Sequence, residues 1–243
     1  MPTQRSSTVD IESFITAGYV TVRGAVDERV ALGIRSAAAE LVPASGSLPW
    51  QLGQSSVYDM PLLLQAVTKA VRHAFDELAG VGKWHMAANW GFPTRFPGPT
   101  DALWHIDGDW FTHHVNSGEQ ILTPIFFWDD VGPDDGPTLL CRGSHRPVAQ
   151  LLAEHEPDGI RGDQIAVLVH EAIETSDVVA ATGSAGDVIV CHPFLAHSIN
   201  PAGPPKARFI SNVAVHGFTP LNTFREPPPL TPVEVAIAQA LAP

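Results

Sequence analysis

Trp104-His105-Ile106-Asp107-Gly108 is the stretch around which the fold of this chain can be built. Successive side chains of an extended strand alternate between its two faces, so His105 and Asp107 point to the same side. An imidazole and a carboxylate placed in this way can occupy two adjacent corners of a divalent metal ion. A third ligand must come from a distant segment, because one short stretch cannot wrap three corners without strain. We therefore expect a strand here that meets another strand across a metal.

Two later residues could complete such a site. His197 follows the apolar segment 187–190, and Arg208 begins another strand-like segment. Two histidines and one carboxylate form the ligand set typical of non-haem Fe(II), which leaves coordination positions open. The guanidinium of Arg208 can pair with a carboxylate through two hydrogen bonds. A His-x-Asp pair is weak evidence by itself, and His192 is an alternative third ligand, so the interpretation depends on the residues taken together.

The apolar pattern divides the chain into a helix-rich part, about 1–82, a β-rich part, about 83–218, and a tail with a helix, 219–243. Helices are predicted at 10–17, 27–42, 61–78, 147–154 and 232–241. Strands are predicted at 19–22, 84–91, 102–106, 121–128, 138–142, 178–181, 188–191 and 208–216. This pattern is typical of one mainly β domain with flanking helices. We expect a double-stranded β-helix core (jelly roll, cupin-like) with the N-terminal helices packed on one sheet.

Composition narrows the class of protein. The 243 residues include 14 basic and 26 acidic ones, a net charge of −12, and the basic residues form no cluster, which disfavours nucleic-acid binding. Cys141 and Cys191 suggest no disulfide framework. No apolar run reaches membrane-spanning length and no signal pattern opens the chain, so we expect a soluble, cytoplasmic protein. Proline and glycine clusters, as at 93–99 and 227–229, predict surface loops.

Several segments resemble the phytanoyl-CoA dioxygenase family of Fe(II)- and 2-oxoglutarate-dependent oxygenases. They are the opening segment 11–24, His105-Ile106-Asp107, Trp128-Asp129-Asp130-Val131, Gly136-Pro137-Thr138, Gly143-Ser144-His145-Arg146, Gly186-Asp187-Val188 and His192-Pro193-Phe194-Leu195-Ala196-His197. The spacing from His197 to Arg208 is also similar to that of the family. The order and spacing of these pieces are specific, although no single piece is.

The resemblance implies a jelly roll in which His105, Asp107 and His197 hold Fe(II). It favours His197 over His192 because of the spacing to Arg208. The cosubstrate 2-oxoglutarate would bind the iron at one end and Arg208 at the other, where Thr123 would add a hydrogen bond. With O2, such an enzyme hydroxylates, desaturates or cyclises its substrate and releases succinate and CO2. No catalytic residue beyond the metal ligands is implied.

Residues just past the His-x-Asp pair are candidates for contact with a small-molecule substrate. We expect Trp110 and Phe111 there, together with His113; its neighbour His114 would face the opposite way on a strand. His145 is interpreted as a structural residue. A small neutral or cationic metabolite, or a natural-product intermediate, is favoured over a coenzyme-A thioester, because an acidic surface repels phosphates.

Two other classes of function fit the same residues. One is a jelly-roll protein that binds metal and ligand without turnover. The other is a cupin-type metal enzyme without a keto-acid cosubstrate, which would leave Arg208 without a role. Substrate-independent binding and consumption of 2-oxoglutarate would separate these alternatives from the oxygenase.

Overall fold

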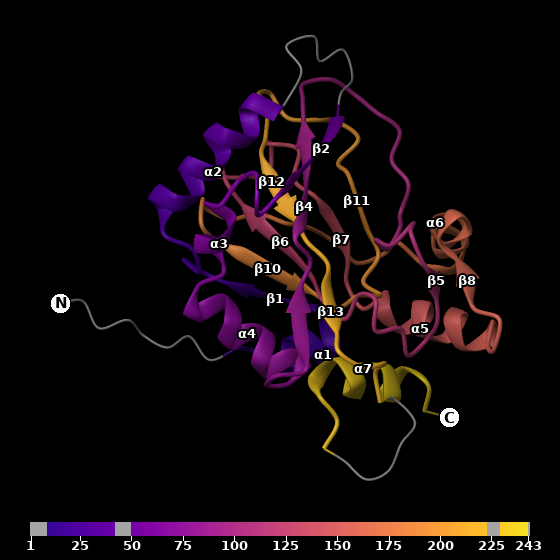
Figure 1. The fold of residues 1–243 in the computed structure, drawn as a ribbon. Helices are drawn as coiled ribbons and strands as arrows, with labels where there is room; N and C mark the ends of the chain where they lie inside the picture. The colour runs from indigo at the N-terminus through magenta and orange to yellow at the C-terminus, as the bar shows by residue number, and fades with distance from the viewer. Residues whose placement is uncertain (1–8, 42–49, 223–228, 243) are drawn as a thin grey trace.

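A six-stranded sheet is the centre of the computed structural model, which describes residues 9–41, 50–222 and 229–242 (Figure 1). Its strands are, in spatial order, β1 (Tyr19–Val22), β10 (Val188–Cys191), β6 (Thr123–Phe127), β12 (Ile210–Asn212), β4 (Asn89–Arg95) and β2 (Trp50–Ser56). A second sheet contains β11 (His197–Ser198), β7 (Leu139–Cys141) and β9 (Val178–Ala180). Two small ribbons pair β13 (Val215–Gly217) with β3 (Trp84–Met86) and β5 (Thr112–His113) with β8 (Ile160–Arg161). All these pairings are antiparallel.

The two main sheets enclose one of the two apolar clusters. Alternate residues of the six-stranded sheet, among them Ile125, Ile189 and Ile210, pack with Leu140 and Leu195 from the side of the smaller sheet. We call this surface of the large sheet the inner face. Two antiparallel sheets packed in this way form the double-sheet jelly roll that the sequence predicted.

The outer face of the large sheet packs against helices. Phe126, Trp128 and Val190 alternate with the inner residues and belong to a cluster shared with the helices. These are α2 (Glu28–Leu41), α3 (Leu63–Ala66) and α4 (Lys69–Ala79), which lie on one side of the sheet in Figure 1. Strands β6 and β10 are buried along their whole length because both faces of the sheet are covered.

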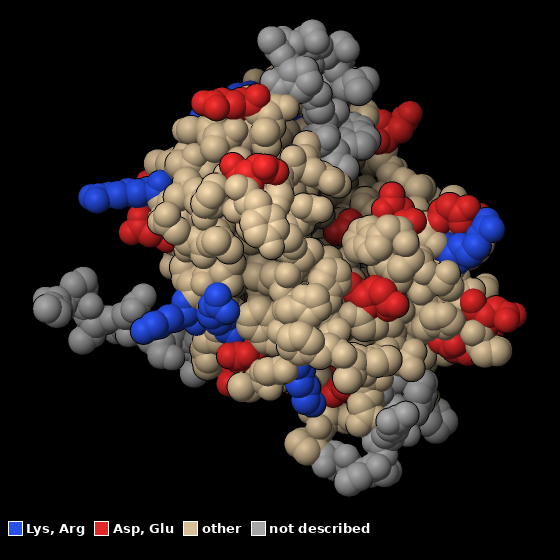
Figure 2. Space-filling model, in the orientation of Figure 1, with Lys and Arg blue, Asp and Glu red and all other residues tan. Residues whose placement is uncertain are grey.

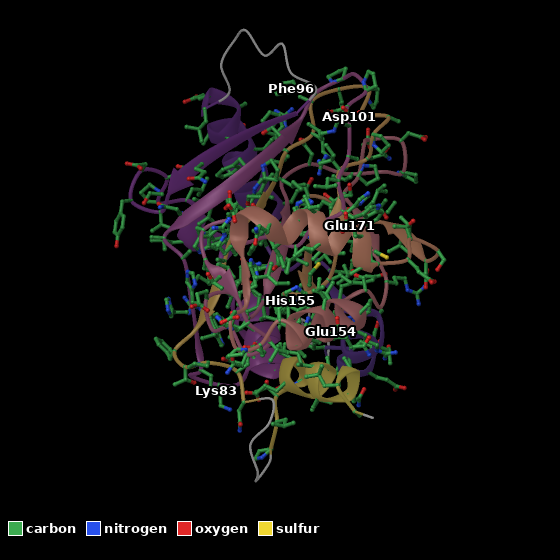
Figure 3. All side chains as sticks on the ribbon, turned by 90° about the vertical axis from the view of Figure 1, so that its right-hand side faces the viewer. Lys83, Phe96, Asp101, Glu154, His155 and Glu171 are labelled. Atoms are coloured by element: carbon green, nitrogen blue, oxygen red, sulfur yellow. The ribbon has the colours of Figure 1, made fainter. Side chains whose placement is uncertain are left out.

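The remaining helices lie at one end and one side of the sandwich. α1 (Ile11–Ala17) and α5 (His145–Glu154) both contact α7 (Pro232–Ala240). Figure 3, turned toward the smaller sheet, shows α6 (Gly162–Ala172), marked by Glu171, across the front and α5, marked by His155, below it. Phe96 and Lys83 mark opposite ends of the sandwich in that view.

The helix predictions were confirmed at four places and corrected at one. Asp10 caps α1 through the amide of Ser13, and Thr231 with Glu234 forms a capping box on α7. The predicted helix 61–78 is two helices. The first ends at Ala66, and Thr68 accepts a hydrogen bond from the amide of Val71 to begin the second. The end of the helix predicted to reach Val42 lies outside the described residues, as does most of the cluster 227–229.

The strand predictions needed more correction. Residues 84–91 and 208–216 each divide into two strands, and β4 continues through Pro93, which had been placed in a loop. The predicted strand 102–106 is wrong: only His105 makes a β-bridge. Strand β2 and helix α6 were missed. Since β1 and β2 belong to the large sheet, the boundary near residue 82 does not separate helices from the β core.

No helix among the described residues is both long and apolar enough to cross a membrane.

Candidate metal centre

His105, Asp107 and His197 meet at the edge between the two sheets. Each offers one ligand atom, and these three atoms lie within 4.8 Å of one another. Nε2 of His105 is 3.9 Å and Nε2 of His197 is 3.5 Å from Oδ1 of Asp107. It is the only group of this kind that the described part of the chain contains. The convergence predicted from the His-x-Asp spacing is therefore present.

Backbone pairing brings the distant histidines together. The amide of His105 donates to the carbonyl of His197 at 3.0 Å, and the amide of His197 donates back at 2.9 Å. His197 also pairs with Leu140 of β7, so the smaller sheet fixes its position. A single bridge is enough to place His105, which explains why the predicted strand is not needed.

Both imidazoles are held in the orientation that a metal ligand requires. Nδ1 of His105 lies 2.9 Å from the carbonyl of Leu103, and Nδ1 of His197 lies 3.1 Å from that of Leu195. A carbonyl only accepts, so each Nδ1 carries the proton and each Nε2 presents a lone pair. Two such lone pairs facing a carboxylate oxygen repel it, and either a cation between them or a proton on Nε2 of His197 relieves this repulsion. The donor set thus fits a divalent metal ion.

Asn212 holds the carboxylate, a role that the sequence did not reveal. Its Nδ2 donates to Oδ2 of Asp107 at 3.0 Å, which leaves Oδ1 facing the histidines. Asn212 lies directly opposite Gly91 on β4. A Cβ on Gly91 would come within 2.5 Å of Oδ1 of Asn212, so the glycine makes room for the amide.

The charges of the three ligands are coupled. Burial opposes ionisation of Asp107, but His197, by charge and hydrogen bond, and His105 hold its pKa well below the usual range. Burial and the neighbouring His197 lower the pKa of His105. Burial alone would lower the pKa of His197 too, yet Asp107 raises it above its ordinary value. The carboxylate is thus ionised at neutral pH, as a metal ligand must be.

Arg208 lies deeper on the inner face. It bridges Arg95 of β4 and precedes Asn212 by four residues, so both side chains belong to one face, about 13 Å apart along the strand. The residue is 3% exposed, and among the described residues its Nε and Nη1 have no hydrogen-bond partner. Burial and the charge of Arg95 lower its pKa to about 10, while Asp129 opposes this. A buried guanidinium with unused donors fits an anionic ligand group.

Thr123 does not lie beside Arg208. Asn212 pairs with Ile125, and the bridge between Leu122 and Val215 continues this register, so Thr123 is level with residue 214. That is six residues from Arg208, or about 20 Å along the strand. Thr123 accepts a hydrogen bond from Gln120 at 2.6 Å. The predicted hydrogen bond to the carboxylate held by Arg208 is therefore inconsistent with the register.

The three substrate-contact candidates occupy different environments. Trp110 is 58% exposed and its ring lies 5.5 Å from that of Phe111. His113 is buried, stacks on Phe111 at 4.1 Å and bonds through Nε2 to the carbonyl of Gly108 at 2.7 Å. The structure thus places His113 where it supports the turn after Asp107, with its ring against Phe111. Trp110 and Phe111 remain candidates.

The other histidines lie elsewhere. His192 and His145 are both buried, with ring centroids 5.0 Å apart, and neither belongs to the metal group. His145 bonds to the carbonyl of Ile15 at 3.1 Å, in keeping with its predicted structural role. His114 pairs with Glu156 at 3.0 Å. Cys141 and Cys191 are buried free thiols, as expected.

Comparison with known proteins identifies relatives at the level of family and fold. The family described as phytanoyl-CoA dioxygenase (PhyH) matches residues 14–201, which include all three candidate ligands. No curated protein matches the chain.

Solved structures with the same fold are distant in sequence. SnoK, a non-haem α-ketoglutarate-dependent carbocyclase from nogalamycin biosynthesis, is 16% identical with a TM-score of 0.62, over 91% of this chain and 88% of that one. EvdO2 from Micromonospora carbonacea var. aurantiaca, complexed with 2-oxoglutarate, is 15% identical with a TM-score of 0.61, over 90% and 94%. HygX from Streptomyces hygroscopicus, with nickel and 2-oxoglutarate bound, is 16% identical with a TM-score of 0.57, over 88% of each chain.

Proposed function

The chain belongs to the phytanoyl-CoA dioxygenase family, and from this premise we propose that it is a non-haem Fe(II)- and 2-oxoglutarate-dependent dioxygenase acting on a small metabolite or natural-product intermediate. The observation that carries the proposal is the convergence of His105, Asp107 and His197 with both Nε2 atoms turned toward one carboxylate oxygen. This is the two-His, one-carboxylate arrangement of Fe(II) oxygenases. With 2-oxoglutarate and O2, such a centre supplies oxidation of a C–H bond, with succinate and CO2 as coproducts.

Arg208 distinguishes this function from other uses of the same metal ligands. Its buried, unused donors suit the distal carboxylate of a dicarboxylic acid that reaches from the metal along the inner face. Ile210, between Arg208 and Asn212, belongs to the apolar inner cluster and would line the path. The carbon chain of 2-oxoglutarate is short and apolar, so an apolar path suits it.

The residues of the chain contribute position and charge. The Nδ1 bonds of His105 and His197 turn their Nε2 atoms toward the position of the metal, and Asn212 keeps Asp107 turned toward them. These bonds fix ligand geometry before the metal arrives, which strengthens binding. Because Asp107 fills the carboxylate position, we expect hydroxylation, with desaturation or ring closure as variants of the same oxidation.

The surface around the site favours a substrate without negative charge. Figure 2 shows a hollow beside β4 with acidic atoms at its floor and rim and no basic atoms at its edge on this face. The chain carries a net charge of −12, so a polyphosphate such as coenzyme A would be repelled. Among the solved structures with this fold, SnoN is in complex with nogalamycin RO and HygX has hygromycin B bound, which supports a natural-product substrate here.

Anaerobic titration tests the proposal. Addition of 2-oxoglutarate to the Fe(II)-loaded protein is expected to produce a weak charge-transfer band in the visible spectrum. On exposure to air without substrate, the protein is expected to convert 2-oxoglutarate slowly to succinate. Arg208→Met is expected to raise the KM for 2-oxoglutarate about 100-fold, because a bidentate charged pair contributes roughly 2–4 kcal/mol. Arg142→Met, at an exposed site, is the control.

The same experiment separates the two alternatives. A cupin-type enzyme without a keto acid predicts no response to Arg208→Met, whereas the burial of this residue beside the inner face argues for a bound anion. A non-catalytic binding protein predicts the visible band without succinate across a broad metabolite panel. Absence of the band in the wild-type protein would contradict the proposed function.

A further inference from the structure

Part of the inner face is open to solvent. On β4 and β2 the outer residues Trp90 and Ser55 are buried, whereas Asn89 and Gln54 are exposed and Ser56 is half-buried. The smaller sheet does not cover these two strands, since β11, β7 and β9 pack over the strands around β6. The inner face therefore continues beyond the sandwich as an uncovered surface, which we call the shelf: Gln54, Ser56, Asn89 and Gly91.

The shelf adjoins the metal centre. Gln54 lies directly opposite Gly91, and Gly91 lies directly opposite Asn212, so these residues share the inner face. Asn212 in turn bonds Asp107 at 3.0 Å. Adjacent strands are about 4.8 Å apart, which puts the Gln54 backbone about 10 Å from that of Asn212. A small molecule that contacts Gln54 can therefore also reach the candidate metal ligands.

The shelf also extends away from Arg208. Along β4, Arg95 is opposite Arg208, Gly91 is opposite Asn212, and Asn89 lies farther in the same direction. Ser56 is paired with Asn89. A diacid held by Arg208 would approach the metal from one side, and the shelf lies on the other. The two halves of the inner face are thus separate, and both remain available at once.

The groups on the shelf are neutral and hydrogen-bonding. Among the described residues the side-chain amides of Gln54 and Asn89 have no hydrogen-bond partner, and the Ser56 hydroxyl, which accepts from Tyr58, can still donate. Amides and hydroxyls donate and accept together, which matches the hydroxyl groups of a polyol better than a charged or apolar surface. Gly91 adds no side chain, so none rises from the shelf at that position, between Gln54 and Asn212.

We propose that this shelf is the substrate subsite and that it binds a neutral, hydroxyl-rich part of the substrate, such as a glycosyl or polyol unit. The inference rests on the proposed function, because it assigns a substrate class to that same site. It names Gln54 and Asn89 as specificity-determining residues. Each would hold a substrate hydroxyl while the neighbouring carbon faces the metal.

Side-chain amide NMR tests the subsite directly. The protein is loaded with Zn(II), a diamagnetic substitute for Fe(II), and with 2-oxoglutarate, and is titrated with methyl α-D-glucopyranoside. The amide signals are assigned by their loss in Gln54→Leu and Asn89→Leu. We expect both to shift on titration, and each single variant to weaken the glucoside by about fivefold, the loss of one hydrogen bond. Gln164→Leu, at an exposed site on α6, is the matched control.

Two results would overturn the inference. One is a glucoside titration that leaves both amide signals in place, or that proceeds with equal affinity in Gln54→Leu. The other is a shift of these signals by indole or putrescine instead, which would indicate an apolar or cationic subsite. Calorimetric binding of 2-oxoglutarate to the same samples keeps the proposals distinct: retained binding with unshifted amides refutes the shelf alone, and lost binding in the wild type refutes the proposed function.

Discussion

Two pairs of histidine rings lie inside this molecule at similar separations but in different surroundings. The rings of His105 and His197 are 4.5 Å apart, and those of His145 and His192 are 5.0 Å apart. The first pair faces the carboxylate of Asp107 and is partly exposed. The second pair is 1% exposed at each residue and packs between aromatic rings and backbone carbonyls.

The difference shows what turns a pair of histidines into a candidate metal site. In the first pair Nδ1 is bonded and Nε2 is offered to a shared carboxylate. In the second pair burial lowers the pKa of His145 to about 4, and burial together with the neighbouring His145 lowers the pKa of His192. Their Nε2 atoms lie near the carbonyls of Ile15 and Val233. An ionised oxygen between the rings, rather than ring proximity, is the feature that matters.

Removing that oxygen has the largest expected effect. Asp107→Ala leaves two imidazoles without the anionic ligand, so Fe(II) affinity is expected to fall at least about 100-fold and succinate release to become undetectable. Anaerobic calorimetry measures the affinity. Asp109→Ala, two positions along and exposed, is the control and should bind Fe(II) like the wild type. Unchanged Fe(II) affinity in Asp107→Ala would show that the shared carboxylate does not distinguish the two histidine pairs.

Low pH is expected to reduce the stability of the folded protein through the other pair, His145 and His192. Burial, the largest cause, keeps His145 neutral in the folded protein, whereas the unfolded chain takes up a proton near pH 6.5. Stability is therefore complete above pH 6.5 and falls as the pH drops toward 4, by about 3 kcal/mol from this residue. Urea unfolding of the metal-free protein across this range measures the slope.

A matched pair of variants sharpens the acid experiment. His145→Gln keeps a donor for the Ile15 carbonyl but cannot titrate, so the slope between pH 6.5 and 4 should decrease. His73→Gln, at an exposed position of α4, controls for the loss of a histidine. An equal slope in His145→Gln and the wild type would show that this pair does not govern acid sensitivity.

Asn212→Ala tests the support of the carboxylate. Without the 3.0 Å hydrogen bond to Oδ2, Asp107 is free to turn from the histidines, and Fe(II) affinity is expected to fall 10- to 100-fold, the range typical of residues that orient metal ligands. The histidine pair at His145 should be unaffected, so acid unfolding serves as the control measurement. Full affinity in Asn212→Ala would mean that Asp107 needs no such support.

The smallest expected effect is at Gly91. A methyl group there meets Oδ1 of Asn212 at 2.5 Å, so Gly91→Ala should displace the amide and weaken Fe(II) by a few-fold. Gly53→Ala is the matched control on the neighbouring strand, where the nearest atom would be at 4.0 Å. Equal affinities in the two variants would show that Asn212 tolerates the contact.

Patterns within the sequence determined the class of fold and the ligand set. Runs of apolar residues in segments such as 121–128 and 188–191 predicted the buried strands, and Asp10 marked the start of the first helix. The two-residue spacing of His105 and Asp107 predicted a shared face. These inferences succeeded because each depends on a few neighbouring residues whose geometry follows from the backbone period.

Only the tertiary structure decided how those pieces meet. The register of β6 against β12 placed Thr123 away from Arg208, and the bond of His113 to the carbonyl of Gly108 gave this residue a place in the turn after Asp107. The same register revealed Asn212 on Asp107 and the open shelf on β4 and β2. Pairing between strands far apart in the chain is set by how whole sheets pack, and no local periodicity records it.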